Sequence, residues 1–350
     1  MDKKDSQRPG PRPGALQVFR TRMQLIRAFR SGGGTADYPP LYLWVESTAR
    51  CNLRCPMCPQ SEGLNRPFGN MPRERIERIA RQAAGRVQLA SMHFAGEPLL
   101  NRELGELVRA MRRAGVPTIM HSNGILMTRE RAAELIDAGL GQVVFSFDAI
   151  PPEDYEKKRP PATLEKAVKG ITALLEEKKS RRSRWPLVTI KSLLFDNPAA
   201  AQSPVEQVRA YFPGLPVDNY CIEYAHTFSG SFAAKMGEDS KYASVARTGA
   251  GYCVMPWYGF AVGWDGEAYV CCNDLNGEQP LGNVDEAGLD GVWNGEAMTR
   301  VRRLIATGHI DEIPVCATCA SRSPFDPRAI LTDAAKHTAK HVIRPGVFPV

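Results

Sequence analysis

Apolar and polar positions alternate along the middle of the chain in a pattern that predicts strands and helices in turn. Short apolar runs predict strands at 41–47, 88–95, 118–121, 142–148, 187–195 and 217–225. Between them, apolar residues recur every three or four positions, which predicts helices at 73–84, 103–114, 129–138, 164–179 and 205–212. Strands joined by helices run in parallel, so the pattern predicts an α/β fold, and a partial (β/α)6 barrel of the TIM type fits it.

The two ends of the chain have different patterns. Residues 1–37 are basic and rich in proline and glycine, with an amphipathic stretch at 16–29 that predicts a helix ending at Gly32–Gly34. Short strands, glycines and cysteines follow the predicted barrel. We therefore expect an N-terminal extension (1–37), a barrel (38–230), a small α+β domain (231–323) and a loosely structured tail (324–350) with a helix near 330–342.

Composition and charge narrow the classes of partner. The formal charge of the 350 residues is +7, and residues 1–37 hold eight Lys or Arg against three Asp, so most of the excess lies in the extension. A folded basic face with interleaved aromatics is absent from the pattern, which makes nucleic acid an unlikely partner. No apolar run approaches the roughly 18–20 residues needed to cross a bilayer, and the N-terminus lacks a secretory signal. We expect a cytoplasmic protein without a membrane partner.

Nine cysteines are many for such a protein, and their odd number favours metal ligands over a disulfide framework. Cys51, Cys55 and Cys58 form a CxxxCxxC loop directly after the first predicted strand. Three thiolates can hold three irons of a [4Fe–4S] cubane and leave the fourth iron open to a small molecule. The alternative is a zinc knuckle, which would need a fourth ligand nearby, and the sequence has none within twenty residues on either side.

The region from about 38 to 321 resembles the radical S-adenosylmethionine (SAM) enzymes, with the CxxxCxxC loop as the strongest match. Met57 stands where that family usually has an aromatic residue. The resemblance implies that SAM binds the open iron. It also implies SAM contacts after the next strands. Gly96, Glu97 and Pro98 would bind the amino group, while Ser122 and Asn123, and Ser146 and Asp148, would contact the carboxylate and ribose. The alternative for these four residues is an ordinary structural role in turns and in the barrel. Lys191, on the fifth predicted strand, is a further candidate for the SAM pocket, and its alternative is a position on the surface.

A second group of cysteines resembles the C-terminal SPASM/twitch extension of that family. The resemblance implies one auxiliary [4Fe–4S] cluster held by Cys253, Cys271, Cys316 and Cys319. Cys272 is the alternative to Cys271, because adjacent side chains on a strand point to opposite faces. Four thiolates also suit zinc, so a structural zinc site stays open.

The resemblance implies an enzyme that reductively cleaves SAM to a 5′-deoxyadenosyl radical and abstracts a hydrogen atom from its substrate. With one auxiliary cluster as electron acceptor, we expect a two-electron dehydrogenation of a small-molecule alcohol such as an aminocyclitol or sugar. A flavodoxin or ferredoxin-type protein would supply the electron. The alternatives are modification of a ribosomal peptide or protein side chain, and a non-enzymatic zinc or cluster carrier. Catalytic residues are unassigned, and the pocket candidates are Cys221, Glu223, Tyr224 and His226.

Overall fold

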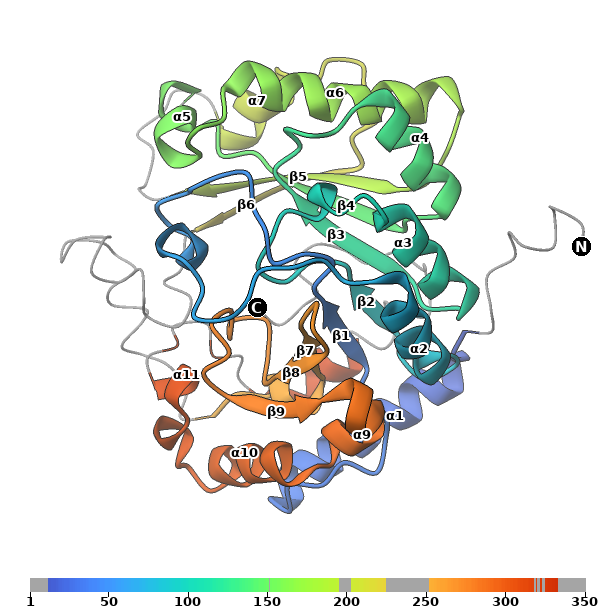
Figure 1. The fold of residues 1–350 in the computed structure, drawn as a ribbon, viewed down its shortest axis with the longest axis vertical. Coiled ribbons are helices and arrows are strands. Elements are labelled where there is room, and N and C mark those ends of the chain that lie inside the picture. The colour runs from blue at the N-terminus through green and yellow to red at the C-terminus, as the bar shows by residue number, and fades with distance from the viewer. Residues whose placement is uncertain are drawn as a thin grey trace, which may run out of the picture.

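The computed structural model describes residues 12–150, 152–194, 203–224, 252–317, 319, 322 and 325–332. Within these residues the strands form a nine-stranded sheet of order β6-β5-β4-β3-β2-β1-β7-β8-β9. The sheet curves through the molecule as an arc in Figure 1. This arrangement confirms the α/β class and the barrel-like parallel sheet expected from the sequence.

Six parallel strands and the helices between them make up the larger part of the sheet. The strands are β1 (Tyr42–Val45), β2 (Leu89–Ser91), β3 (Thr118–Ser122), β4 (Gln142–Ser146), β5 (Leu187–Leu194) and β6 (Asn219–Tyr224). The helices are α2 (Arg73–Ala83), α3 (Leu104–Arg113), α4 (Arg129–Ala138), α5 (Tyr155–Lys158), α6 (Leu164–Ser180) and α7 (Pro204–Arg209). Every strand and helix predicted for the barrel is present. Most strands are shorter than predicted, β3 extends one residue further to Ser122, and α7 ends at Arg209 instead of 212.

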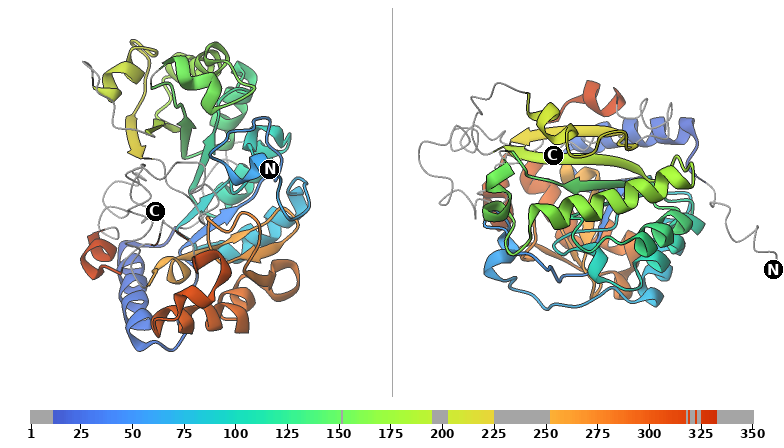
Figure 2. Two further views of the ribbon diagram at one scale, coloured as in Figure 1. Left: turned by 90° about the vertical axis from the view of Figure 1, so that its left-hand side faces the viewer. Right: turned by 90° about the horizontal axis from the view of Figure 1, so that it is seen from above.

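Local sequence explains where these helices begin and end. Thr128 and Thr163 cap α4 and α6, since each side-chain oxygen accepts a hydrogen bond from the backbone three residues later. Ser203 and Glu206 form a reciprocal capping box at the start of α7. Gly139 ends α4 at φ +82°, a left-handed conformation that glycine adopts without strain. Helices α2, α3, α4 and α6 then cover the outer side of the sheet (Figures 1 and 2).

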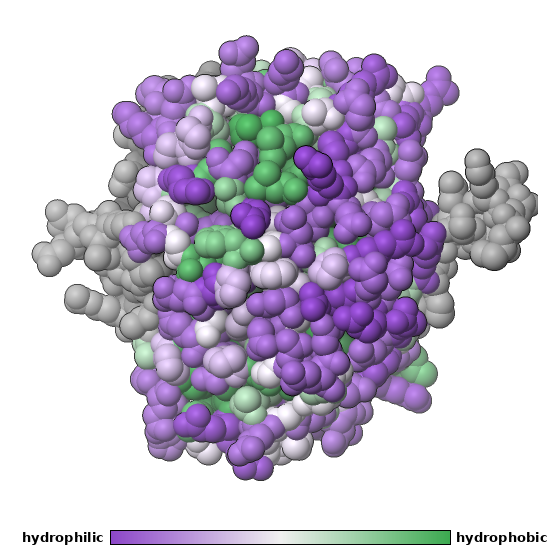
Figure 3. Space-filling model, in the orientation of Figure 1, coloured by the Kyte–Doolittle hydropathy of each residue, from purple (hydrophilic) through white to green (hydrophobic). Residues whose placement is uncertain are grey.

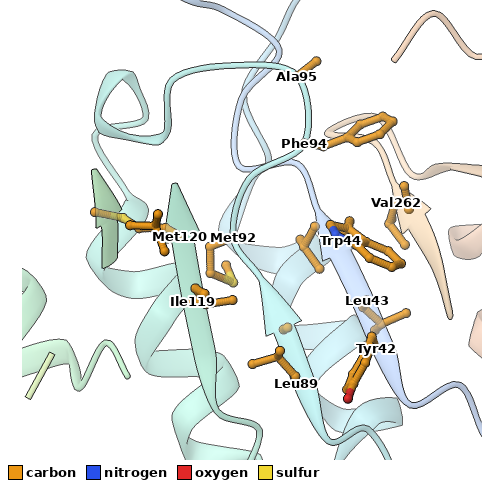
Figure 4. Packing of buried hydrophobic residues seen from close by; sticks show 14 of the residues in the cluster. Tyr42, Leu43, Trp44, Leu89, Met92, Phe94, Ala95, Ile119, Met120 and Val262 are labelled. Atoms are coloured by element: carbon orange, nitrogen blue, oxygen red, sulfur yellow. The ribbon is translucent and has the colours of Figure 1, made fainter. Parts of the chain in front are cut away.

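The C-terminal part extends the same sheet. Its elements are β7 (Gly259–Val262), β8 (Glu267–Tyr269), β9 (Pro280–Asn283), α9 (Val284–Trp293), α10 (Glu296–Ala306) and α11 (Pro314–Ala317). Strand β7 pairs in parallel with β1, and β8 and β9 follow in antiparallel pairing. In Figure 4, Trp44 and Val262 extend from the neighbouring strands β1 and β7. The sequence pattern did not predict this continuity, because it separated the two parts.

The expected helix in the extension is present as α1 (Ala15–Ser31), and Gly32 ends it at φ +66°. Its residues Val18, Leu25 and Ile26 are buried, and Phe29 packs against Trp257 and Phe325. The helix is therefore part of the folded body beside the C-terminal elements. The face of the molecule in Figure 3 is mostly hydrophilic, with small apolar areas between polar residues. The predicted boundary at 230 and most of the tail lie outside the described residues.

Candidate active site

The cysteine loop follows β1 and opens into a cavity of about 350 Å³. Cys51, Cys55 and Cys58 all line that cavity, with Cys55 buried and the other two half-buried. The Cys58 N–H donates to the Cys55 carbonyl at 2.9 Å, and the Arg54 N–H donates to the Pro160 carbonyl at 2.6 Å. These bonds hold the loop at the carboxyl end of β1, which is the end where (β/α) barrels bind ligands.

Glu97 lies in the same cavity just beyond the end of β2. Its carboxylate accepts hydrogen bonds from the Ser122 hydroxyl at 2.8 Å and from the backbone N–H groups of Asn123 and Leu99 at 2.7 and 3.1 Å. Burial raises its pKa, while these three donors lower it. The side chain is therefore fixed in place, and a cationic group in the cavity would complete its surroundings.

Gly96 brings the Glu97 turn against the cysteine loop. A Cβ at this position would lie 2.1 Å from the Thr48 carbonyl oxygen and 2.6 Å from that of Arg50. The Glu97 N–H donates to the Arg50 carbonyl at 2.8 Å. Pro98 then begins the short 3-10 helix Pro98–Leu100. Only glycine allows this close approach of the two backbones.

Asp148 also lines the cavity, and both of its oxygens already have protein donors. One accepts from the Leu193 N–H at 2.7 Å, and the other accepts from Arg159 Nε at 2.8 Å. Arg159 in turn directs an N–H toward the sulfur of Cys55 at 3.9 Å. Sequence reasoning did not select Arg159, because nothing along the chain indicates that it reaches a cysteine 104 positions earlier.

The inner side of β3 to β6 carries further polar residues that line the cavity. Ser146, Lys191 and Glu223 are among them, and Lys191 forms an ion pair with Glu223. Cys221 donates to Glu223 Oε1 at 3.3 Å, and burial raises its pKa to about 11. Of the remaining candidates, Tyr224 is the last residue of β6, the placement of its side chain is not described, and His226 lies outside the described residues.

Two histidines that the sequence reasoning missed line this cavity. His93 lies two residues beyond β2, and His121 lies on β3. Their signal in the sequence was a polar residue at the inward position of an otherwise apolar strand. That signal is weak, because one strand alone does not show which of its faces is enclosed.

The second group of cysteines surrounds a separate small pocket of about 20 Å³. Cys253, Cys271, Cys272, Cys316 and Cys319 all line it, with Arg322 beside them. Both Cys271 and Cys272 line this pocket, so its lining does not choose between them as the cluster ligand. Strand β8 ends at Tyr269, so the two cysteines lie in a bend where side chains do not alternate between faces.

The donor sets at the two places suit iron–sulfur clusters. Among the described residues, no group of three or more His, Cys, Asp or Glu side chains is arranged so that it could hold a single metal ion. Zinc ligands surround one ion closely, with sulfur about 2.3 Å from the metal, whereas the ligands of a cubane are spread over separate irons. Three cysteines line one cavity and five line the other pocket, which is enough thiolates for a cubane with one open iron and for a fully ligated cubane.

The large cavity and the C-terminal cysteine group share part of one wall. The segment after β8 supplies this wall, because Cys272, Asn273 and Leu275 also line the large cavity. Arg66, beyond the cysteine loop, forms a buried ion pair with Glu46 and donates to the Leu275 carbonyl at 2.6 Å. The guanidinium lies 5.2 Å from the Phe94 ring centroid and 5.4 Å from that of Tyr269.

Comparison with known sequences identifies the family. Residues 45–190 match the radical SAM superfamily, and residues 253–320 match SPASM, an iron–sulfur cluster-binding domain. The chain belongs to the radical SAM superfamily. Its cofactors are SAM, the [4Fe–4S] cluster of the radical SAM domain and an auxiliary iron–sulfur cluster in the SPASM domain.

Curated relatives differ in how much of the chain they match. PqqA peptide cyclase of Rhodopseudomonas palustris is 37% identical over 109 residues, which span 31% of this chain and 29% of that protein. The chain thus aligns with less than a third of this relative's length. The tungsten-containing aldehyde ferredoxin oxidoreductase cofactor-modifying protein of Pyrococcus furiosus is 25% identical over 329 residues, or 81% of this chain and 88% of that protein.

Two solved structures share the fold. SuiB of Streptococcus suis, bound to its precursor peptide SuiA, superposes with a TM-score of 0.58 at 14% identity and covers 88% of this chain and 76% of that one. BtrN in complex with AdoMet and 2-DOIA has a TM-score of 0.53 at 17% identity, and the match covers 81% of this chain and 94% of that one.

No helix within the described residues of this radical SAM protein has the length and apolarity to cross a membrane.

Proposed function

We propose that this radical SAM protein dehydrogenates a small-molecule alcohol such as an aminocyclitol or sugar. The observation that carries the proposal is the shared cavity. It is lined on one side by Cys51, Cys55 and Cys58 and on the other by Cys272, Asn273 and Leu275. A substrate bound there would lie between the place where a radical forms and a place that can accept an electron.

The cysteines would act as ligands of two separate clusters. Cys51, Cys55 and Cys58 would hold the SAM-binding [4Fe–4S] cluster, and Cys253, Cys271, Cys316 and Cys319 the auxiliary one, with Cys272 as the alternative to Cys271. When bound, these groups supply a 5′-deoxyadenosyl radical and an electron acceptor. The substrate carbon would give a hydrogen atom to this radical, its hydroxyl would give a proton to a general base, and the remaining electron would pass to the acceptor, which leaves a ketone.

Several chain residues would orient SAM. Glu97 is the candidate for the amino group, because its buried carboxylate is already positioned by three donors. Gly96 and Pro98 shape its turn. Ser122, Asn123 and Ser146 are candidates for the carboxylate and ribose. Asp148 would act mainly by holding Arg159, since both its oxygens are engaged. We further propose a flavodoxin or ferredoxin-type electron donor.

A second function, modification of a peptide, has one observation in its favour. The segment related to PqqA peptide cyclase is 37% identical, the higher identity of the two curated relatives described above. Because the matched segment spans only 29% of that relative, we rank dehydrogenation of an alcohol above modification of a peptide. Incubation of the reconstituted protein with deuterated alcohols and with deuterated peptides separates the two, since deuterium enters 5′-deoxyadenosine only from a true substrate.

Anaerobic iron–sulfur reconstitution tests the proposal most directly. Two cubanes predict about eight irons per chain. Replacement of Cys51, Cys55 and Cys58 by alanine should remove about half of the iron and abolish SAM cleavage, whereas alanine at Cys253, Cys316 and Cys319 should spare the cleavage. Cys221→Ala is the matched control, because this cysteine lies outside both sets. Stoichiometric zinc with iron near zero would refute the proposal.

A further inference from the structure

His93 and His121 form a stacked pair at the wall of the large cavity. Their ring centroids are 4.2 Å apart at an interplanar angle of 20°. Ser146 and Lys191 line the same cavity as the pair. His121 pairs with Val144, two residues before Ser146 on β4, and Ser146 pairs with Lys191 on β5. None of the proposed cluster ligands or SAM contacts uses either imidazole ring.

Hydrogen bonds fix the tautomer of His93. Its Nδ1 accepts the backbone N–H of His121 at 3.2 Å and lies 2.7 Å from the Ser91 hydroxyl oxygen. An amide N–H can only donate, so Nδ1 carries a lone pair and the proton of the neutral ring is on Nε2. Among the described residues Nε2 has no hydrogen-bonding partner, which leaves one N–H donor available on a ring that lines the cavity.

The charges around this donor cancel. Burial, together with the nearby Lys191 ammonium, lowers the pKa of His93 to about 3 and that of His121 well below its usual value, so both rings are neutral. Lys191 and Glu223 neutralise each other in their ion pair, and Cys221 donates to Glu223. The cluster therefore offers hydrogen-bond donors and acceptors without a net charge, which suits a neutral group that both donates and accepts.

We propose that His93, His121, Lys191 and Glu223 form a substrate subsite for an uncharged hydroxyl-bearing group. His93 Nε2–H donates to a hydroxyl oxygen of the substrate, and the Glu223 carboxylate accepts from a hydroxyl. The subsite rests on the proposed function, because it gives that reaction its substrate class and places the hydroxyls in the cavity that the cysteine loop lines. A carboxylate or ammonium of a substrate would gain no net attraction here.

Two substitutions at His93 separate hydrogen bonding from packing. His93→Gln retains an N–H at the position of Nε2, whereas His93→Asn retains the inner acceptor and loses the donor into the cavity. The probes are perdeuterated myo-inositol and glucose and a deuterated glycine-rich hexapeptide, with deuterium in 5′-deoxyadenosine as the readout. We expect transfer from a polyol, a KM at least tenfold higher for His93→Asn, and a KM within threefold of wild type for His93→Gln.

Other readouts isolate this inference from the proposed function. Iron content and SAM cleavage without substrate should be equal in wild type and both variants, and loss of these in wild type means that the proposed function itself fails. Nitrogen-15 NMR of the substrate-free protein should show His93 as the Nε2–H tautomer. A ring protonated at Nδ1, transfer from the peptide alone, no transfer from either polyol, or an unchanged KM in His93→Asn would each overturn the subsite.

Discussion

At the scale of single residues, Glu97 shows how position converts an ordinary carboxylate into a candidate binding group. The side chain is 3% exposed and accepts three hydrogen bonds from neighbouring segments of the chain. Burial disfavours its charge, so a cation bound beside it would recover part of that cost. Glu103, a few residues later, is exposed and has no such surroundings.

We expect Glu97→Gln to weaken SAM binding to the reconstituted protein by roughly tenfold or more, because it removes a charged hydrogen-bond partner worth about 1.5–3 kcal/mol. Isothermal titration with SAM measures the effect. Glu103→Gln is the matched control and should bind SAM as wild type does. Equal dissociation constants for the two variants would exclude Glu97 as a SAM ligand.

At the scale of elements, the pairing of β7 with β1 attaches the cysteine-rich C-terminal part to the barrel strands. The pairing needs a residue without a side chain at Gly259, where a Cβ would lie 1.9 Å from the Tyr42 carbonyl oxygen. Both atoms belong to backbone in a buried sheet, so neither side can move away easily. The sequence predicted a strand at 41–47 and short strands after the barrel, but not the contact between them.

Gly259→Ala should therefore destabilise the protein by about 3 kcal/mol, at the upper end of the usual cost of overpacking, and lower Tm by several degrees. Thermal unfolding followed by circular dichroism measures this. Gly33→Ala provides the control, because a Cβ at that exposed glycine meets only an ordinary contact at 3.6 Å. Similar melting temperatures for both variants would mean that the β1–β7 pairing contributes little to stability.

At the scale of the whole molecule, a buried ion pair inside the barrel and two surface ion pairs help to hold the barrel against the C-terminal part. Glu46 and Arg66 are buried, with side-chain exposures of 0% and 5%, and Arg66 also reaches Leu275. Asp285 pairs with Arg75 and Arg78 at the surface, where its side chain is 27% exposed. Water and salt screen the surface pairs, so their contribution should be much smaller.

Substitution of these two acids tests the difference. Glu46→Gln leaves the Arg66 charge buried without a full partner and should cost about 3–5 kcal/mol. Asp285→Asn should cost less than about 1 kcal/mol per ion pair lost. Urea unfolding under the same buffer compares the two free energies of unfolding. The interpretation fails if Asp285→Asn is the more destabilising change.

The sequence by itself determined the strand and helix alternation and the CxxxCxxC spacing, because both depend on residues close together in the chain. It also placed Glu97 one β unit after the cysteine loop, which sufficed to expect both at one end of the sheet. Only the tertiary structure decided which side chains meet across strands. It brought Arg159 to Cys55, stacked His93 on His121, and turned both Cys271 and Cys272 toward one pocket. These contacts join residues up to about a hundred positions apart, and their geometry depends on the register and curvature of the sheet, which local sequence patterns do not specify.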